Sequence, residues 1–178
     1  MKKFIFYNLI LMLAVSCDYK SPSPETVETS DYSKEGLSFD LPKYWEVAED
    51  SKMEVGRYVE VENKEPLGSG LVVLSIFDET QNNTEVVEMM NNKYRRIFSE
   101  QNVQYELLDQ PHEVTIEKVK ATEGNGQIQM LGQKEMIRIV VFDLPNKKTV
   151  CFALTSNSDD MKENKIFSEK ILTSMKME

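Results

Sequence analysis

The two side chains best suited to nucleophilic or acid–base chemistry, His112 and Cys151, lie far apart in the sequence. His112 follows Pro111 in a polar stretch, whereas Cys151 stands between Val150 and Phe152 in an apolar one. A general base needs a nucleophile and an orienting carboxylate beside it, and the sequence groups no such trio. We therefore predict an exposed His112, a small buried thiol at Cys151 and no enzyme activity; a hydrolase that uses His112 as its base is the third-ranked alternative.

Acidic side chains gather at three places where a hard cation could bind. They are Glu60 with Glu62 and Glu65, Asp78 with Glu79, and Asp159 with Asp160. Calcium needs several oxygens that converge in one loop. The spacing of Glu60 and Glu62 instead puts both on one strand face, and the two aspartates precede a predicted helix, whose dipole favours them. We predict no metal site and no other cofactor.

Two glycine pairs are too short for phosphate-binding loops. Residues 68–70 (Gly-Ser-Gly) and 124–126 (Gly-Asn-Gly) do not open a predicted helix, and a phosphate loop needs a helix N-terminus behind it. We expect both pairs to form turns.

A different chemistry is predicted for Cys17. Lys2 and Lys3 precede a mostly apolar run, residues 4–16, which ends in small residues directly before Cys17. A basic start, a short apolar core and small residues before a cut site are typical of a secretory signal. A cysteine at this place resembles the lipobox of bacterial lipoproteins. The resemblance implies that residues 1–16 are a lipoprotein signal peptide and that the Cys17 thiol is the lipidation site.

Lipidation implies a location in the cell envelope. Buried acyl chains, such as palmitate, contribute about 0.8 kcal/mol per methylene, so the protein would be held on the bacterial cell membrane or the outer membrane, facing the periplasm or the cell exterior. Asp18 resembles an inner-membrane retention signal, but does not decide between the two membranes. The alternatives are an uncleaved anchor, for which residues 4–16 are short of the roughly 20 that a spanning helix needs, and an ordinary cleaved signal.

The overall charge limits the classes of partner. The formal net charge is −9, and removal of residues 1–16 takes away two lysines and no acid. So acidic a chain is repelled by nucleic-acid phosphates and by anionic headgroups. We therefore expect no nucleic acid, and contact with the membrane only through the N-terminal lipid. The chain has two cysteines, so a lipidated Cys17 leaves Cys151 without a disulfide partner.

Residues 17–33 are predicted to be a flexible tether, because they are rich in Ser, Thr and Pro and have few large apolar groups. A single domain is expected over residues 34–178. Apolar alternation or continuous apolar runs predict its strands. These are residues 37–41, 45–47, 53–62, 71–77, 105–108, 114–122, 128–131, 136–142 and 149–154.

Two segments have helical periodicity instead. Residues 84–101 carry an apolar stripe and a possible cap at Asn83 or Thr84, and a second helix is expected to start at Ser158. Its buried stripe is Phe167, Ile171, Leu172 and Met175. Short turns imply antiparallel neighbours, and strands that are apolar on both faces must be covered on both. The fold class is therefore α+β, with an antiparallel sheet of about six to seven strands between helices.

The order of motifs resembles the PsbP-like family. Residues 36–42 (GLSFDLP) with Trp45 are similar to the family's opening motif, and residues 171–176 (ILTSMK) to its closing one, with Met175 in the aromatic place. The resemblance implies a PsbP-like α/β/α sandwich, and the family includes DcrB-type bacterial envelope lipoproteins. Its members have unrelated functions, so these packing positions indicate a fold and no activity.

Two functions remain in the foreground. The first is a membrane-anchored envelope lipoprotein whose domain is a non-enzymatic protein-binding or assembly module for another envelope protein. The alternative is a carrier or sensor for a small ligand, held in a cleft between the sheet and the helix of residues 84–101. That cleft would be lined by Phe77, Tyr94 and Phe98, so its presence or absence separates the two hypotheses.

Overall fold

The computed structural model describes residues 28–66, 68–130 and 132–178; Cys17 and the predicted signal peptide lie outside them. The elements follow the chain as β1 (Thr29–Lys34), β2 (Leu37–Pro42), β3 (Trp45–Met53), β4 (Gly56–Asn63), β5 (Leu71–Phe77), α1 (Asn83–Glu100), β6 (Tyr105–Leu107), β7 (His112–Ile116), β8 (Val119–Met130), β9 (Gln133–Asp143), β10 (Thr149–Asn157), α2 (Met161–Ser174) and β11 (Lys176–Met177).

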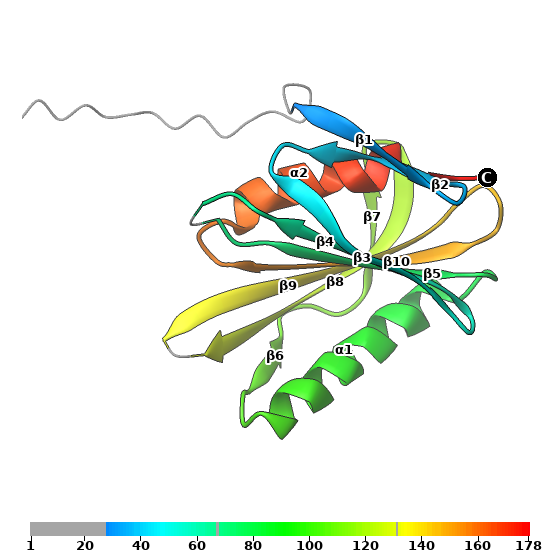
Figure 1. Cartoon of the computed structure of the whole chain (residues 1–178). Helices are drawn as coiled ribbons and strands as arrows, with labels where there is room; N and C mark the ends of the chain where they lie inside the picture. The colour runs from blue at the N-terminus through cyan, green and yellow to red at the C-terminus, as the bar shows by residue number, and fades with distance from the viewer. Residues whose placement is uncertain (1–27, 67, 131) are drawn as a thin grey trace, which may run out of the picture.

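The architecture is an α+β sandwich, as predicted. An eight-stranded antiparallel sheet has the order β3-β4-β5-β10-β9-β8-β6, with β7 also paired to β8, and a three-stranded sheet has the order β1-β2-β11. Helix α1 covers one face of the large sheet, while α2 and the small sheet cover the other (Figure 1). The central strands β5, β9 and β10 are apolar on both faces because both faces are covered.

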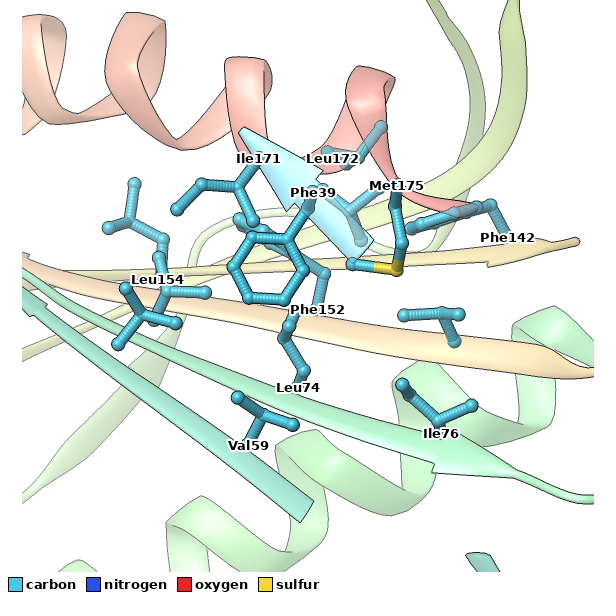
Figure 2. Close-up of a cluster of buried hydrophobic side chains, with 14 of the residues drawn as sticks. Phe39, Val59, Leu74, Ile76, Phe142, Phe152, Leu154, Ile171, Leu172 and Met175 are labelled. Atoms are coloured by element: carbon cyan, nitrogen blue, oxygen red, sulfur yellow. The ribbon is translucent and has the colours of Figure 1, made fainter. Parts of the chain in front are cut away.

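The core on the α2 side joins three layers. Figure 2 shows Phe39 of the small sheet between Ile171 of α2 and the side chains of the large sheet beneath it. Phe152 and Leu74 of that sheet are fully buried in the same cluster. The motif residues at 36–42 and 171–176 therefore act in packing, as the resemblance implied.

The core on the α1 side is smaller. Val87 and Met90 of α1 pack with Ile139 and Cys151 of the sheet. The helix begins one residue earlier than predicted, because the side chain of Asn82 is the cap. Its Oδ1 accepts hydrogen bonds from the backbone N–H groups of Thr84 and Glu85 at 3.1 and 3.3 Å.

The fold extends into the predicted tether. Residues 29–33 were expected to be flexible, yet they form β1, which pairs with β2 in the register Tyr32↔Phe39. The two rings are 4.8 Å apart between centroids, and the Tyr32 hydroxyl donates to the Asp50 carboxylate. Backbone pairing with β2 along the whole strand and the two contacts of Tyr32 thus accompany order in a segment whose composition favours disorder.

The predicted turn at residues 124–126 is wrong. These residues lie inside β8, and the chain turns at Glu117, which has a φ of 53°. Gly124 provides space: a Cβ at this position would be 2.6 Å from Cγ1 of Val87. The glycine lets α1 approach the sheet closely. The other glycine pair, residues 68–70, lies in a loop as expected.

The start of α2 also differs from the prediction. The helix begins at Met161 with Asp160 as its N-cap, but the Asp160 side chain accepts no capping hydrogen bond from the backbone N–H groups of the helix. The Asp160 carboxylate instead accepts hydrogen bonds from the Ser69 hydroxyl and the Asn157 amide, each at 2.9 Å. Asp160 therefore joins the loop of residues 68–70 to the helix start.

Candidate functional site

The large sheet splits between β8 and β9. These strands pair from Met130↔Gln133 to Thr122↔Val141. Beyond that point residues 119–121 of β8 pair only with β7, and residues 142–144 have no partner on the side of β8 within the described chain. We call this opening, between residues 119–121 and 142–144, the β8–β9 fork.

The fork contains a half-open hollow of about 830 Å³, within the size range of ligand sites. It is bounded by the β7–β8 hairpin, the β9–β10 turn, the end of α2 and the start of α1. Its lining consists of Asn83, Glu113, Val114, Thr115, Lys118, Val119, Lys120, Ala121, Thr122, Phe142, Asp143, Leu144, Pro145, Leu172, Thr173 and Met175.

The apolar side chains of the lining lie toward α2. Phe142, Leu144, Leu172 and Met175 are buried members of the α2-side core. Because side chains alternate along a strand, the neighbouring Asp143 points to the opposite face and is exposed. The hollow therefore has one apolar wall and one polar rim.

Packing holds the fork open. Ile116 and Ala121 of the β7–β8 hairpin are buried in the α2-side core, and Val114 and Val119 pack against it. The hairpin curves toward α2, away from β9 (Figure 1). Its apolar face is thus already buried against the core in this open arrangement.

Polar groups at the rim have few partners. Lys118 and Lys120 are exposed, and neither forms an ion pair with any residue that the structure describes. The Asp143 carboxylate accepts a hydrogen bond from the Thr149 hydroxyl at 2.5 Å. The Asn83 side-chain oxygen is buried and has no hydrogen-bond partner among the described residues, which is uncommon for a buried polar atom.

The structure does not bring the candidate catalytic residues together. His112 is exposed, with Nδ1 3.1 Å from the Gln110 carbonyl oxygen. Cys151 is 1% exposed, and burial raises the pKa of its thiol to about 12. His112 pairs with Glu123 and Cys151 with Val141, positions on opposite faces of the sheet. The sheet therefore separates His112 from Cys151, and the two side chains cannot act together as a base and a nucleophile.

The predicted acidic groups have separate local roles. Glu62 forms an ion pair with Lys64, and Asp78 forms one with Lys148 at 2.9 Å. In the parts of the chain that the structure describes, no three His, Cys, Asp or Glu side chains are grouped as a metal site would require.

Side chains fill the place where a ligand cleft was expected. Phe77, Tyr94 and Phe98 pack against the α1-side core. Tyr94, Phe98 and Tyr105 stack on one another, with ring centroids 6.1–6.4 Å apart.

The β8–β9 fork is not predicted from the sequence, because the apolar pattern of residues 114–122 places β7 and the start of β8 in one continuous strand. The sequence does contain one sign of the turn between β7 and β8, namely the polar pair Glu117-Lys118 between two apolar runs.

Helix length and hydropathy give one further finding. Within the described residues, neither helix is both long and apolar enough to span a bilayer.

The sequence matches no protein-family model and no curated protein. Solved structures do share the fold. A Bacteroides thetaiotaomicron protein is 14% identical with a TM-score of 0.55 over 83% of this chain, which spans only about half (48%) of that protein. Cyanobacterial PsbP (CyanoP) of Synechocystis is 12% identical, with a TM-score of 0.55 over 85% of this chain and 94% of its own.

LpqN of Mycobacterium tuberculosis, a protein involved in cell envelope biogenesis, is 10% identical, with a TM-score of 0.51 over 85% of this chain and 91% of its own. At such identities the likeness concerns the fold alone. The chain has the α+β fold of CyanoP and LpqN, that is, a PsbP-like fold.

Proposed function

We propose that this protein is a bacterial envelope lipoprotein, anchored through Cys17, whose domain is a non-enzymatic module that binds another envelope protein. The anchor is supported by the arrangement of residues 1–17. The envelope role is supported by the structural likeness to LpqN, which is involved in cell envelope biogenesis.

The observation that carries the binding role is the β8–β9 fork. It is a half-open hollow of about 830 Å³, bordered by two strand edges that no strand among the described residues pairs with on the fork side. Unpaired edges and an apolar wall are features that a protein partner can use, whereas His112 and Cys151 are separated by the sheet.

A small-ligand carrier is the second candidate. The hollow is of a suitable volume, but its rim is charged and its opening is wide, and the cleft expected beneath α1 is filled. Native mass spectrometry of the protein purified in detergent separates the two. A small molecule that is retained in stoichiometric amount would favour the carrier.

The anchor is tested by replacing Cys17. We expect cells labelled with a palmitate analogue to incorporate it into the wild type and into Cys151→Ala, and not into Cys17→Ala. The Cys17→Ala protein should leave the membrane fraction. Labelling that persists in Cys17→Ala, or a membrane-bound wild type without any acyl mass on residue 17, would reject the lipidated anchor.

The binding role is tested in the same strain. Chemical cross-linking in intact cells, followed by solubilisation in detergent and purification of the lipidated protein, should recover the same envelope protein in every repeat. Recovery of no reproducible partner would contradict an assembly or binding role.

A further inference from the structure

We propose that the β8–β9 fork binds an extended segment of a partner protein, in which apolar and polar residues alternate and the polar ones include acidic side chains. This inference rests on the proposed function and names the site and the chemistry of the partner. It follows from the backbone edges of the fork, from its two side-chain faces and from its charge.

The first argument concerns the backbone of β9. The Leu144 N–H donates to the Lys148 carbonyl at 2.8 Å, so it points toward β10. Successive residues of a strand direct their N–H and C=O groups to opposite sides. The N–H and C=O groups of Asp143 therefore point into the fork, where no strand in the described part of the chain pairs with them. An extended peptide can pair with this edge, as in β-strand addition.

The second argument concerns the alternation of side chains. A strand placed in the fork would direct every second residue toward Ala121, Phe142 and Leu144, all of which are buried and apolar. The residues between them would emerge on the other face, beside Lys120 and Asp143. The wall therefore favours a segment in which apolar residues alternate with polar ones.

The third argument is charge complementarity. Lys118 and Lys120 stand at the rim of a protein whose formal net charge is −9, and no described residue forms an ion pair with either of them. Glu113 also lies on the rim, on β7, and Asp143 is bonded to Thr149. The free cationic pair thus favours acidic side chains at its end of the fork.

A polar atom inside the hollow supports the same occupant. The Asn83 side-chain oxygen is buried, lines the hollow and has no partner within the described chain. An N–H group of an inserted peptide could donate a hydrogen bond to this oxygen, whereas a purely apolar ligand in the hollow would leave the oxygen without a partner.

If β8 kept its register with β9, Lys120 would lie opposite Asp143, and Ala121 opposite Phe142. The two edges of the fork are therefore already complementary in charge and polarity. A strand inserted between them meets the same alternation of apolar and polar residues on both sides, with Lys120 on the β8 edge available to its acidic residues and Asp143 on the β9 edge.

The test is a titration of the purified, ¹⁵N-labelled full chain in detergent with an acetylated and amidated peptide of alternating valine and aspartate, seven residues long. We expect the amide signals of residues 119–121 and 142–144 to shift, and the Asp143 amide to become protected from hydrogen exchange. Three control peptides should bind about tenfold more weakly. The first has the same residues arranged as a block of valines followed by a block of aspartates. The second has lysine in place of every aspartate. The third keeps the sequence but carries N-methyl groups on alternate backbone nitrogens.

Variants locate the effect within the protein. The double variant Lys118→Glu with Lys120→Glu changes only exposed side chains. It should bind the valine–lysine peptide more tightly than the valine–aspartate peptide, which is the reverse of the wild-type preference. Asp143→Pro removes the N–H that faces the fork, whereas Asp143→Ala keeps it and is the matched control. Because Asp143→Pro can also unfold the strand, the N-methylated peptide provides the same test on the unaltered protein.

Several results would overturn the inference. They are equal binding of the alternating and block peptides, shifts that lie elsewhere, and a self-association measured by sedimentation that accounts for the shifts. The double lysine variant also separates this inference from the proposed function. If that variant still recovers the cellular partner in full, the fork is the wrong site while the binding role stands; if the wild type recovers none, the binding role fails whatever the peptides do.

Discussion

The ring of Tyr105 lies directly against Gly126. A Cβ at residue 126 would be 2.1 Å from the Tyr105 hydroxyl oxygen, and that hydroxyl donates to the Asn91 side-chain oxygen at 2.6 Å. Gly126 pairs with Leu107 of β6, two residues beyond Tyr105. The glycine thus makes room for the aromatic ring that ties β6 to α1.

Gly126→Ala should destabilise the fold by about 1–3 kcal/mol, because the added methyl group collides with a buried ring. Urea unfolding followed by circular dichroism measures this loss. In a Tyr105→Ala background the same substitution should cost much less, since the collision is gone. Additive losses in the double variant would show that Gly126 is needed for some other reason.

The stability of the protein at low pH should depend on Asp50. Arg57 donates to both Asp50 oxygens, from Nε at 2.7 Å and from Nη2 at 2.5 Å. These hydrogen bonds, and secondly that from Tyr32, lower the pKa of Asp50 to about 2. An ordinary aspartate titrates near 3.9, so this contribution is complete above about pH 4 and disappears as the pH falls through about 2.

We therefore expect Asp50→Asn to lose roughly 2 kcal/mol at neutral pH and to show a flatter decline of the unfolding free energy between pH 4 and pH 2. Urea titrations at a series of pH values provide the measurement. Glu54→Gln, at an exposed position between β3 and β4, is the control and should follow the wild type. Parallel curves for wild type and Asp50→Asn would refute the assignment.

Arg138 should be essential for stability, because it neutralises buried acid. Its Nε and Nη2 donate to Glu123 at 2.9 and 2.7 Å, and its Nη1 lies 2.9 Å from a Glu169 oxygen. Burial raises and the guanidinium lowers the pKa of Glu123, and the net direction is downward.

Arg138→Met should cost about 3–5 kcal/mol, since it leaves a buried carboxylate without its partner. Adding Glu123→Gln should recover part of this loss, and thermal unfolding measures both. If Arg138→Met alone is as stable as the wild type, the ion pair has no structural role.

One pair of facing acidic side chains should be open to stabilisation. Glu49 lies directly opposite Glu60 on β3 and β4, and like charges in this position repel. Glu49→Lys should therefore raise the unfolding free energy by about 0.2–1 kcal/mol at low ionic strength, and less at high salt. The control is Glu46→Lys, whose neighbour across the strands, Glu62, already pairs with Lys64; it should gain less. Equal gains would contradict this explanation.

Local patterns were sufficient for most of the elements. Alternation identified β2 and β10, continuous apolar runs identified β5 and β9, and helical spacing identified α1 with an error of one residue at its start. These segments are long, and each is either strongly periodic or continuously apolar, so neighbouring residues carry enough information.

Three features could not be obtained in this way. Order in β1 depends on Phe39 and Asp50, which are distant contacts of Tyr32. The start of α2 depends on hydrogen bonds between Asp160 and the loop of residues 68–70. Glycines 124 and 126 have the composition of a turn, but serve the close approach of Val87 and Tyr105.

The prediction of export and lipidation from residues 1–17 needs no knowledge of the fold, because such a signal is recognised as a linear segment. Strands that are apolar on both faces can also be recognised from the local sequence alone, and they are enough to predict a sheet covered on both faces. The fork is different in kind. Whether Lys120 meets Asp143 depends on how far β8 follows β9 before the packing of Ile116 and Ala121 draws it toward α2, and that competition between non-local contacts has no counterpart in the local pattern of residues.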